Sequence, residues 1–321
     1  MRDLLTRERL ITAALLTVFA LLPPVAEAFG QGYLTNVASR VMIYAIAALS
    51  LDLILGYGAM VSFGHAAFIG IGAYAVGISA EHNLWEGTLT IPMAMAAAGL
   101  FALATGAISL RTRGVYFIMI TLAFGQMAYY TASSLSAYGG DDGLTIWGRS
   151  EVLGNPVLED DTALYFFVLI CLALCWWVAS RVVGSRFGRV IAGVRENRAR
   201  MSAVGFDAYR HQLVAYVLAG MMAGLAGALL ANHAEFVSPA YMSWQRSGDL
   251  IIMVVLGGMG SLYGAVLGAV AYLALEDVLA GFTEHWRVIF GPLLILIVLY
   301  ARGGLARAFR REGPSREGRD G

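Results

Sequence analysis

Charged residues are scarce in this chain of 321 residues: only 14% are charged, whereas 59% are hydrophobic. A soluble globular domain carries about 25% charged residues, so this composition indicates a surface that faces lipid. The length alone would fit about two soluble domains, but the apolar runs leave no stretch for one. The net charge is zero, so no overall field favours nucleic acid, and we expect no nucleic-acid partner.

Lysine is absent and cysteine is rare. The two cysteines, Cys171 and Cys175, lie four residues apart in an apolar run. Two thiols are too few for a metal site and support no disulfide framework, so we expect them to be packed or to face lipid. The sequence also lacks a phosphate-binding loop, a His-Glu-x-x-His motif and a Gly-x-Ser-x-Gly motif. We therefore expect no enzyme activity, metal or cofactor on this chain, and any ATP and Mg²⁺ would be bound by partner chains.

Long apolar runs are what the sequence has instead. A helix needs roughly 20 apolar residues to cross the hydrocarbon core of a bilayer. Candidate spans are residues 10–29, 34–56, 60–80, 89–110, 114–134, 163–183, 211–232, 247–257, 262–280 and 286–301. The 247–257 run is too short to span alone and ends in glycines, which indicates a half-helix or re-entrant segment. The expected fold is an all-α integral membrane protein, a polytopic bundle of about 8–10 transmembrane segments with Gly-broken helices.

Arginines gather in four stretches: 1–9, the turn at Arg111 and Arg113, 181–210, and the tail from 302. These stretches hold 18 of the 22 basic residues, and ten spans place all of them on one side, which the positive-inside rule makes cytoplasmic. The opposite side has an acidic loop, 135–162, in which Arg149 is the lone basic residue. We therefore expect a multi-pass protein of the inner (plasma) membrane, surrounded by lipid, with both termini cytoplasmic and 10–301 as the transmembrane domain.

The two termini leave alternatives open. Residues 1–28 resemble a signal peptide, with arginines, an apolar run and an Ala26-Glu27-Ala28 site, but Pro23 and Pro24 equally fit the kinked outer end of a first helix. The tail, 302–321, is rich in Arg, Gly and Glu and is expected to be disordered. It either anchors the topology or binds anionic lipid.

Residues 184–210 are the one sizeable polar segment between spans on the Arg-rich side. Val190, Ile191, Val194, Met201 and Val204 recur near helical spacing, and Arg and Glu fill the other face. This pattern predicts an amphipathic helix that ends near Gly205. It fits either an interfacial helix on the inner leaflet or a docking helix that lies in a groove on a partner.

Two glycine-rich segments interrupt apolar runs, at 56–74 and 257–269. Paired Gly-interrupted segments mark the binding region of many transporters, although the glycine spacings differ and any internal repeat is weak. The intramembrane polar residues noted are Arg40, Asp52, His65 and Gln126. His65 either lines a path or hydrogen-bonds within the bundle, and Asp52 is near enough to the end of its span to reach water. Candidates for the translocation path are Gly56, Ser62, Gly64, His65, Gln126, Gly257, Gly258, Gly260 and Ser261.

Five collinear stretches resemble the LivM-type permeases of branched-chain amino-acid ABC importers. They are Leu51–Tyr57 with Ser62–Phe68, Arg113–Phe117 with Thr121–Phe124, Gly139–Leu144, Gly188–Gly205, and Ser238–Pro239 with Gly257–Gly264. The resemblance covers residues 40 to 305. Two positions depart from it: Asp52 stands where Asn is common, and Arg198 stands where an acid is frequent. Related urea-type permeases often carry Asp at the first position, so the substrate class stays open.

The resemblance implies a partner set and a coupling helix. The chain would pair with a second, homologous permease, two cytoplasmic ATPase subunits would bind below, and a periplasmic amino-acid binding protein would deliver substrate. The 188–205 helix would be the coupling helix. The coupling residues expected on this basis are Gly188, Arg189, Arg195, Glu196, Asn197 and Gly205, with 195–197 at the ATPase contact. The leading function is import of branched-chain or related amino acids; the alternatives are import of urea or short amides, a stand-alone secondary carrier, and a non-transporting scaffold.

Overall fold

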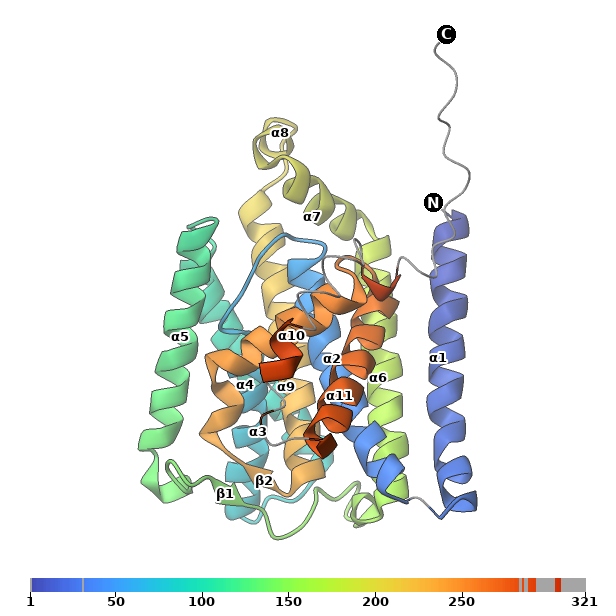
Figure 1. The fold of residues 1–321 in the computed structure, drawn as a ribbon. Helices are drawn as coiled ribbons and strands as arrows, with labels where there is room; N and C mark the ends of the chain where they lie inside the picture. The colour runs from blue at the N-terminus through green and yellow to red at the C-terminus, as the bar shows by residue number, and fades with distance from the viewer. Residues whose placement is uncertain (1, 31, 283–284, 286–287, 293–303, 307–321) are drawn as a thin grey trace.

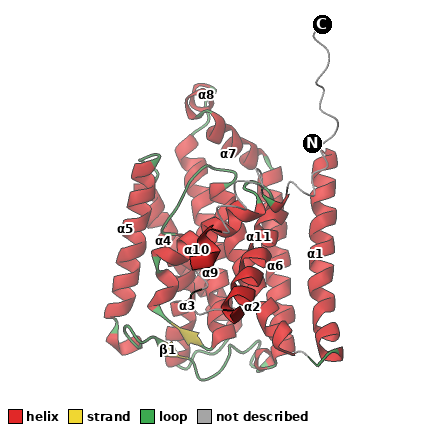
Figure 2. Ribbon diagram, in the orientation of Figure 1, coloured by secondary structure: helices red, strands yellow, loops and turns green. Residues whose placement is uncertain are grey.

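The computed structural model of the chain describes residues 2–30, 32–282, 285, 288–292 and 304–306. Most of these residues are helical, and one short pair of strands and several loops make up the rest (Figure 2). The helices are α1 (Arg2–Ala28), α2 (Gly32–Leu55), α3 (His65–Glu81), α4 (Gly87–Ser109), α5 (Val115–Ser134), α6 (Asp161–Gly184), α7 (Arg186–Glu196), α8 (Arg198–Ala203), α9 (Ala208–Ala234), α10 (Trp244–Gly257) and α11 (Leu262–Phe282). The strands are β1 (Leu144–Thr145) and β2 (Phe236–Val237), and the 3-10 turns are η1 (Ser136–Tyr138), η2 (Val157–Glu159) and η3 (Pro239–Met242).

Seven of these helices are long and apolar enough to cross a membrane: α1, α2, α4, α5, α6, α9 and α11. They confirm an all-α polytopic membrane protein. The long helices start and end within about three residues of the predicted spans, except at the N-terminus. There α1 begins at Arg2, eight residues before the predicted span, although its apolar stretch of spanning length is Ile11–Ala28. Residues 2–9 are mostly Leu, Arg and Glu, which favour a helix and extend α1.

Two of the predicted spans correspond to helices that are shorter than a full span, α3 and α10. The predicted 60–80 span begins only at His65, because residues 56–64 leave the helical path, and α3 has 17 residues. Helix α10 has 14 residues, about 21 Å at 1.5 Å per residue. A 3-10 turn precedes α10 and Gly258 follows it, in agreement with the predicted half-helix.

Helix α2 forms the centre of the bundle, buried from Val41 to Leu55, and Figure 1 shows it among the other long helices. Helix α9 packs closely against α3 and α4 because it presents glycines to them. A Cβ added at Gly227 would meet the carbonyl of Ile69, and one at Gly224 would meet the Cβ of Ala98. Small residues at such crossings let backbones approach in lipid, where packing rather than the hydrophobic effect joins helices.

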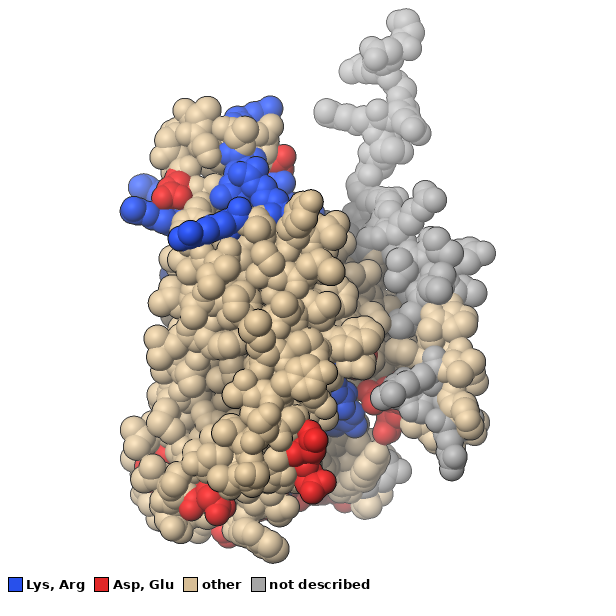
Figure 3. Space-filling model, turned by 90° about the vertical axis from the view of Figure 1, so that its left-hand side faces the viewer, with Lys and Arg blue, Asp and Glu red and all other residues tan. Residues whose placement is uncertain are grey.

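Arginines gather at one end of the molecule and acidic residues lie towards the other, with a largely uncharged surface between them (Figure 3). Helices α7 and α8 form an Arg-rich cap at one end, on the same side as the α4–α5 turn and the start of α1 (Figure 1). The acidic 135–160 loop lies at the other end, where β1 pairs antiparallel with β2. The expected tenth span, 286–301, and the tail, 302–321, lie outside the described residues except for 288–292 and 304–306.

Candidate functional site

The two glycine-rich breaks meet in the structure. Asp52, which is fully buried near the end of α2, accepts a hydrogen bond from the backbone amide of Gly260 at 2.8 Å. Gly56 has no room for a side chain, because the Asp52 carboxylate and the Gly260 amide occupy that space. Gly258 and Gly260 have φ angles of +110° and +77°, which favour glycine. A broken helix in a bilayer must satisfy its freed amides internally, and Asp52 does so here instead of reaching water.

Arg195 joins this contact from the Arg-rich cap. Its Nη1 donates a hydrogen bond to the carbonyl of Gly56, and the same atom lies 3.6 Å from the Cβ position of Gly260. We call Asp52, Gly56, Arg195 and Gly260 the break junction. One side chain of α7 thus bonds to the first interrupted segment and lies beside the second, about 200 residues away in sequence.

The cap has two helices where the sequence predicted one ending near Gly205. Helix α7 starts after Ser185, whose hydroxyl accepts from the Gly188 amide at 3.2 Å, and it ends at Glu196. Asn197 then caps α8 by accepting from the Arg200 amide at 2.9 Å. Since an Asn cap starts a new helix, the chain turns at this residue. Gly205, with φ +94°, follows α8.

The other predicted coupling residues have different surroundings. Gly188 is buried, and a Cβ there would meet the carbonyls of Val182 and Val183. Arg189 and Glu196 are exposed on the cap, so they are free to touch a partner. The buried face of α7 consists of Val190, Ile191 and Val194 together with Gly188, as the apolar spacing predicted.

The other end of the first break, just before α3, is held by hydroxyl groups. Ser247 of α10 accepts from the Ala66 amide at 3.0 Å, and Thr121 of α5 accepts from the Phe63 amide at 3.3 Å. Gly64 lies directly against the carbonyl oxygen of Thr121, where a Cβ would collide. These contacts hold the start of α3 inside the bundle.

His65 hydrogen-bonds within the bundle, one of its two predicted alternatives. Its Nε2 lies 2.8 Å from the Ser50 hydroxyl, and both side chains are fully buried. Ser50 donates its own proton to the carbonyl of Ala47 at 2.7 Å, so the imidazole is the donor to Ser50. The ring also meets Phe68 edge-on.

A cavity of about 710 Å³ opens between α5, α10 and α11. It is lined by Gln126, Tyr129, Ala240, Ser243, Trp244, Gln245, Arg246, Asp249, Ile252, Tyr272, Glu276, Phe290 and Gly291. Gln126 is the path candidate that the structure places on this cavity. Ser62, Gly64 and His65 lie in the packed interior, and Gly257, Gly258, Gly260 and Ser261 lie at or beside the break junction.

Sequence reasoning missed the charged residues of this cavity. Arg246 Nη1 lies 3.8 Å from Asp249 Oδ2, and the Tyr272 hydroxyl donates to Asp249 Oδ1 at 2.7 Å. Arg40 reaches across from α2 to Glu276 at 3.4 Å, which confirms that Arg40 and Asp52 do not pair. The sequence did contain one signal for this pair. Arg246 and Asp249 are three residues apart, about one helical turn, so they lie on the same face of α10.

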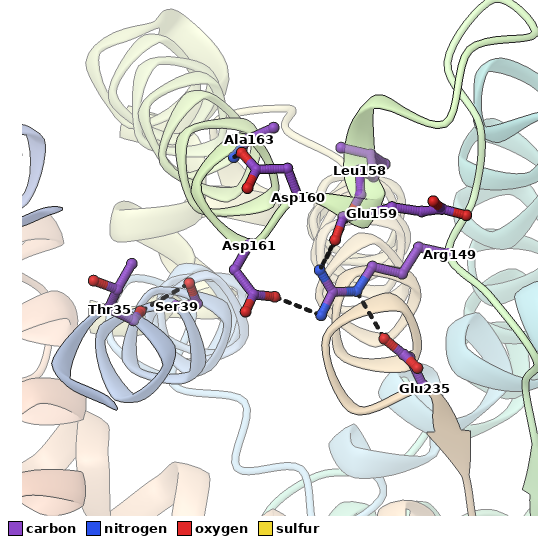
Figure 4. Close-up of polar contacts among 9 residues, drawn as sticks. All are labelled: Thr35, Ser39, Arg149, Leu158, Glu159, Asp160, Asp161, Ala163 and Glu235. Carbon is purple, nitrogen blue, oxygen red and sulfur yellow. Dashed lines mark hydrogen bonds and ion pairs between the residues drawn. The ribbon is translucent and has the colours of Figure 1, made fainter. Parts of the chain in front are cut away.

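At the acidic end, Arg149 holds three segments together (Figure 4). Its guanidinium pairs with Asp161 at the start of α6 at 2.7 Å and with Glu235 after α9 at 3.0 Å. It also donates to the carbonyls of Leu158 and Glu159, both at 3.1 Å. The side chain of Arg149 is 11% exposed, although its two acidic partners are far more exposed. The lone basic residue of the acidic loop thus holds this loop against the start of α6 and the end of α9.

Comparisons with known proteins agree with this architecture. The family model described as "Branched-chain amino acid transport system / permease component" matches residues 33–299. The chain is 29% identical to the high-affinity branched-chain amino acid transport system permease protein LivM of Escherichia coli (strain K12), over 84% of this chain and 69% of that protein. It is also 29% identical to the autoinducer 2 import system permease protein LsrC of Enterobacter sp. (strain 638), over 76% of this chain and 71% of that one.

A more distant relative is the probable branched-chain amino acid transport permease protein LivM of Methanocaldococcus jannaschii, 23% identical over 82% of this chain and 90% of that protein. No solved structure matches the chain. The family model covers most of the described helices and both glycine breaks. The chain belongs to the family of permease components of branched-chain amino acid transport systems.

Proposed function

We propose that this permease forms half of the translocation path of an ATP-driven importer for branched-chain amino acids. The observation that carries the proposal is the break junction, where Arg195 of the cap is bonded to Gly56 while Asp52 is bonded to Gly260. Through these bonds a displacement of α7 reaches two interrupted helices at once. Interrupted helices are the parts of a transporter that line a cavity and can change their arrangement.

In this proposal the Arg-rich cap lies on the cytoplasmic side of the inner membrane, and both termini lie on the same side. Eighteen arginines in four stretches support this orientation. Two ATPase subunits would bind the cap through exposed residues such as Arg189 and Glu196, and they would hold the ATP and Mg²⁺. A second, homologous permease would complete the path, and a periplasmic binding protein would deliver substrate at the acidic end.

The names of the relatives support two substrates. Two LivM proteins match this chain over more than four fifths of its length, and we favour branched-chain amino acids on that basis. The LsrC match, at the same identity of 29%, supports import of autoinducer 2 as the second candidate. No observation favours urea or short amides beyond Asp52, whose carboxylate has the structural role described above.

Deleting this chain from its host tests the function. Uptake of radiolabelled leucine, isoleucine and valine should fall at least about tenfold and return when the chain is restored on a plasmid. Loss of autoinducer 2 uptake with unchanged amino-acid uptake would establish the second candidate instead. Transport by the purified chain alone in liposomes, driven by an ion gradient, would mean a secondary carrier.

A further inference from the structure

The cavity between α5, α10 and α11 carries charges of both signs that face the same space. We propose that it binds its solute as a zwitterion: Arg246 holds a carboxylate, and Asp249 with Glu276 holds an ammonium group. The inference rests on the proposed function, because it names the chemical class of the transported solute. It assigns ligand-binding roles to Arg246, Asp249 and Glu276.

The Arg246–Asp249 pair is built loosely enough to open for a ligand. The 3.8 Å separation of Nη1 and Oδ2 is longer than a hydrogen bond. Their side chains are 35% and 29% exposed, so each still has access to the cavity. A guanidinium offers five N–H donors in a planar fork, and a free carboxylate can take two of them side by side.

Neighbouring residues fix the acidic half of the site. The Tyr272 hydroxyl holds one oxygen of Asp249 at 2.7 Å, which orients the carboxylate. Arg40 reaches Oε1 of Glu276 at 3.4 Å, whereas Oε2 of Glu276 is buried with no hydrogen-bond partner among the described residues. An ammonium group has three donors to offer and would satisfy such an oxygen.

The charges select against solutes of a single sign. Ionised side chains within a bilayer are costly and usually mark a substrate path, so three of them on one cavity call for a ligand that meets them. Because Arg40 already pairs with Glu276, an anion on Arg246 would leave Asp249 without its counter-ion, a cation on Asp249 would leave Arg246 without its own, and an uncharged solute would need neither. A zwitterion matches both signs at once.

The rest of the cavity suits an apolar substituent. Ile252 and Trp244 of α10 and Phe290 line it beside the charged residues. Small-ligand sites typically combine apolar walls with a few placed polar groups. A volume of about 710 Å³ leaves ample room for an amino acid with a branched side chain.

Direct binding to the purified full chain in lipid nanodiscs tests the proposal without ATP or partner subunits. Saturation-transfer NMR would compare L-leucine with L-leucinamide, which lacks the carboxylate, and with 4-methylpentanoate, which lacks the amine. All three probes carry the same isobutyl group. We expect binding of both single-charge analogues to be about tenfold weaker than that of leucine.

Variants then assign the charges. Arg246→Gln should lower leucine binding about tenfold, to the level of leucinamide, and Asp249→Asn should lower it towards that of 4-methylpentanoate. Arg181→Gln is the matched control, because it removes the same charge from an exposed position on α6 and should bind leucine normally. Size-exclusion profiles identify any variant that fails to fold. If Arg246→Gln fails to fold, Arg246→Lys replaces it, because this variant keeps the positive charge but loses the planar fork of donors and should still bind leucine more weakly.

Three results would overturn the proposal: equal binding of the three probes, leucine binding unaffected in both cavity variants, or no leucine binding by the wild-type chain. Each of them leaves the importer function untouched, since the deletion test reads uptake and not this cavity. Conversely, a deletion strain with normal amino-acid uptake would reject the importer function, whatever the NMR experiment shows.

Discussion

Arg195→Ala is expected to uncouple the assembled transporter. Uptake should fall at least about tenfold, the size of effect that losing one hydrogen bond from a charged donor produces, while ATP hydrolysis continues. The reason is that Arg195 bonds the carbonyl of Gly56 and lies beside Gly260, so its loss separates the cap from both breaks. The measurement is ATP hydrolysis and leucine uptake on the same proteoliposomes.

Matched variants separate this role from a general loss of charge. Arg181→Ala removes an exposed arginine near the same end of the bundle and should remain coupled. Asp52→Asn keeps an oxygen acceptor for the Gly260 amide and should transport, whereas Asp52→Ala leaves that amide unpaired and should not. Wild-type uptake by Arg195→Ala would show that α7 does not act through the break junction.

Gly64→Leu should reduce the folded protein in the membrane to less than about a tenth of the wild-type amount, because overpacking a core costs about 1–3 kcal/mol or more. The Cβ of the new side chain would meet the carbonyl oxygen of Thr121, which belongs to the α5 backbone and cannot rotate away. The φ angle of Gly64 is −99°, so the backbone conformation itself suits any residue. The effect therefore reports packing alone.

Gly281→Leu provides the comparison, since among the described residues no atom beyond its own stretch of helix lies within 4 Å of a Cβ at that position. It should keep wild-type abundance and wild-type uptake, measured by fluorescence-detected size-exclusion of membranes solubilised from cells. Normal abundance and uptake in Gly64→Leu would mean that α3 and α5 can move apart, and the close crossing would have no role.

The long helices could be predicted from the sequence because each is a run of apolar residues with its own polar ends. Helix α6, for example, runs from Asp161 to Gly184 against a predicted 163–183. The point at which one cap helix ends and the next begins was harder to predict. Asn197 sits within an amphipathic pattern, and nothing in that pattern says that its side chain will cap α8 rather than continue α7.

Contacts between segments that are distant in sequence could not be predicted from the sequence. The two glycine breaks were recognised separately, but their meeting at Asp52 and Gly260 depends on how α2 packs against α10 and α11. The charged cavity was missed for a related reason. Arg246 and Asp249 flank the start of an apolar run, and Glu276 lies inside a longer one; each lone charge is averaged out in a hydropathy window of about 19 residues. Only the fold shows that these charges share one space.

Cysteine labelling at Ala199 tests most directly the claim that the Arg-rich cap faces the cytoplasm, where the ATPase subunits would bind. Ala199 is exposed on α8, and the native Cys171 and Cys175 are buried, so an impermeant maleimide should report the new thiol alone. We predict that Ala199→Cys is labelled in inside-out vesicles and protected in intact spheroplasts. Labelling in intact spheroplasts, with protection in inside-out vesicles, would contradict the orientation and with it the coupling of α7 to a cytoplasmic ATPase.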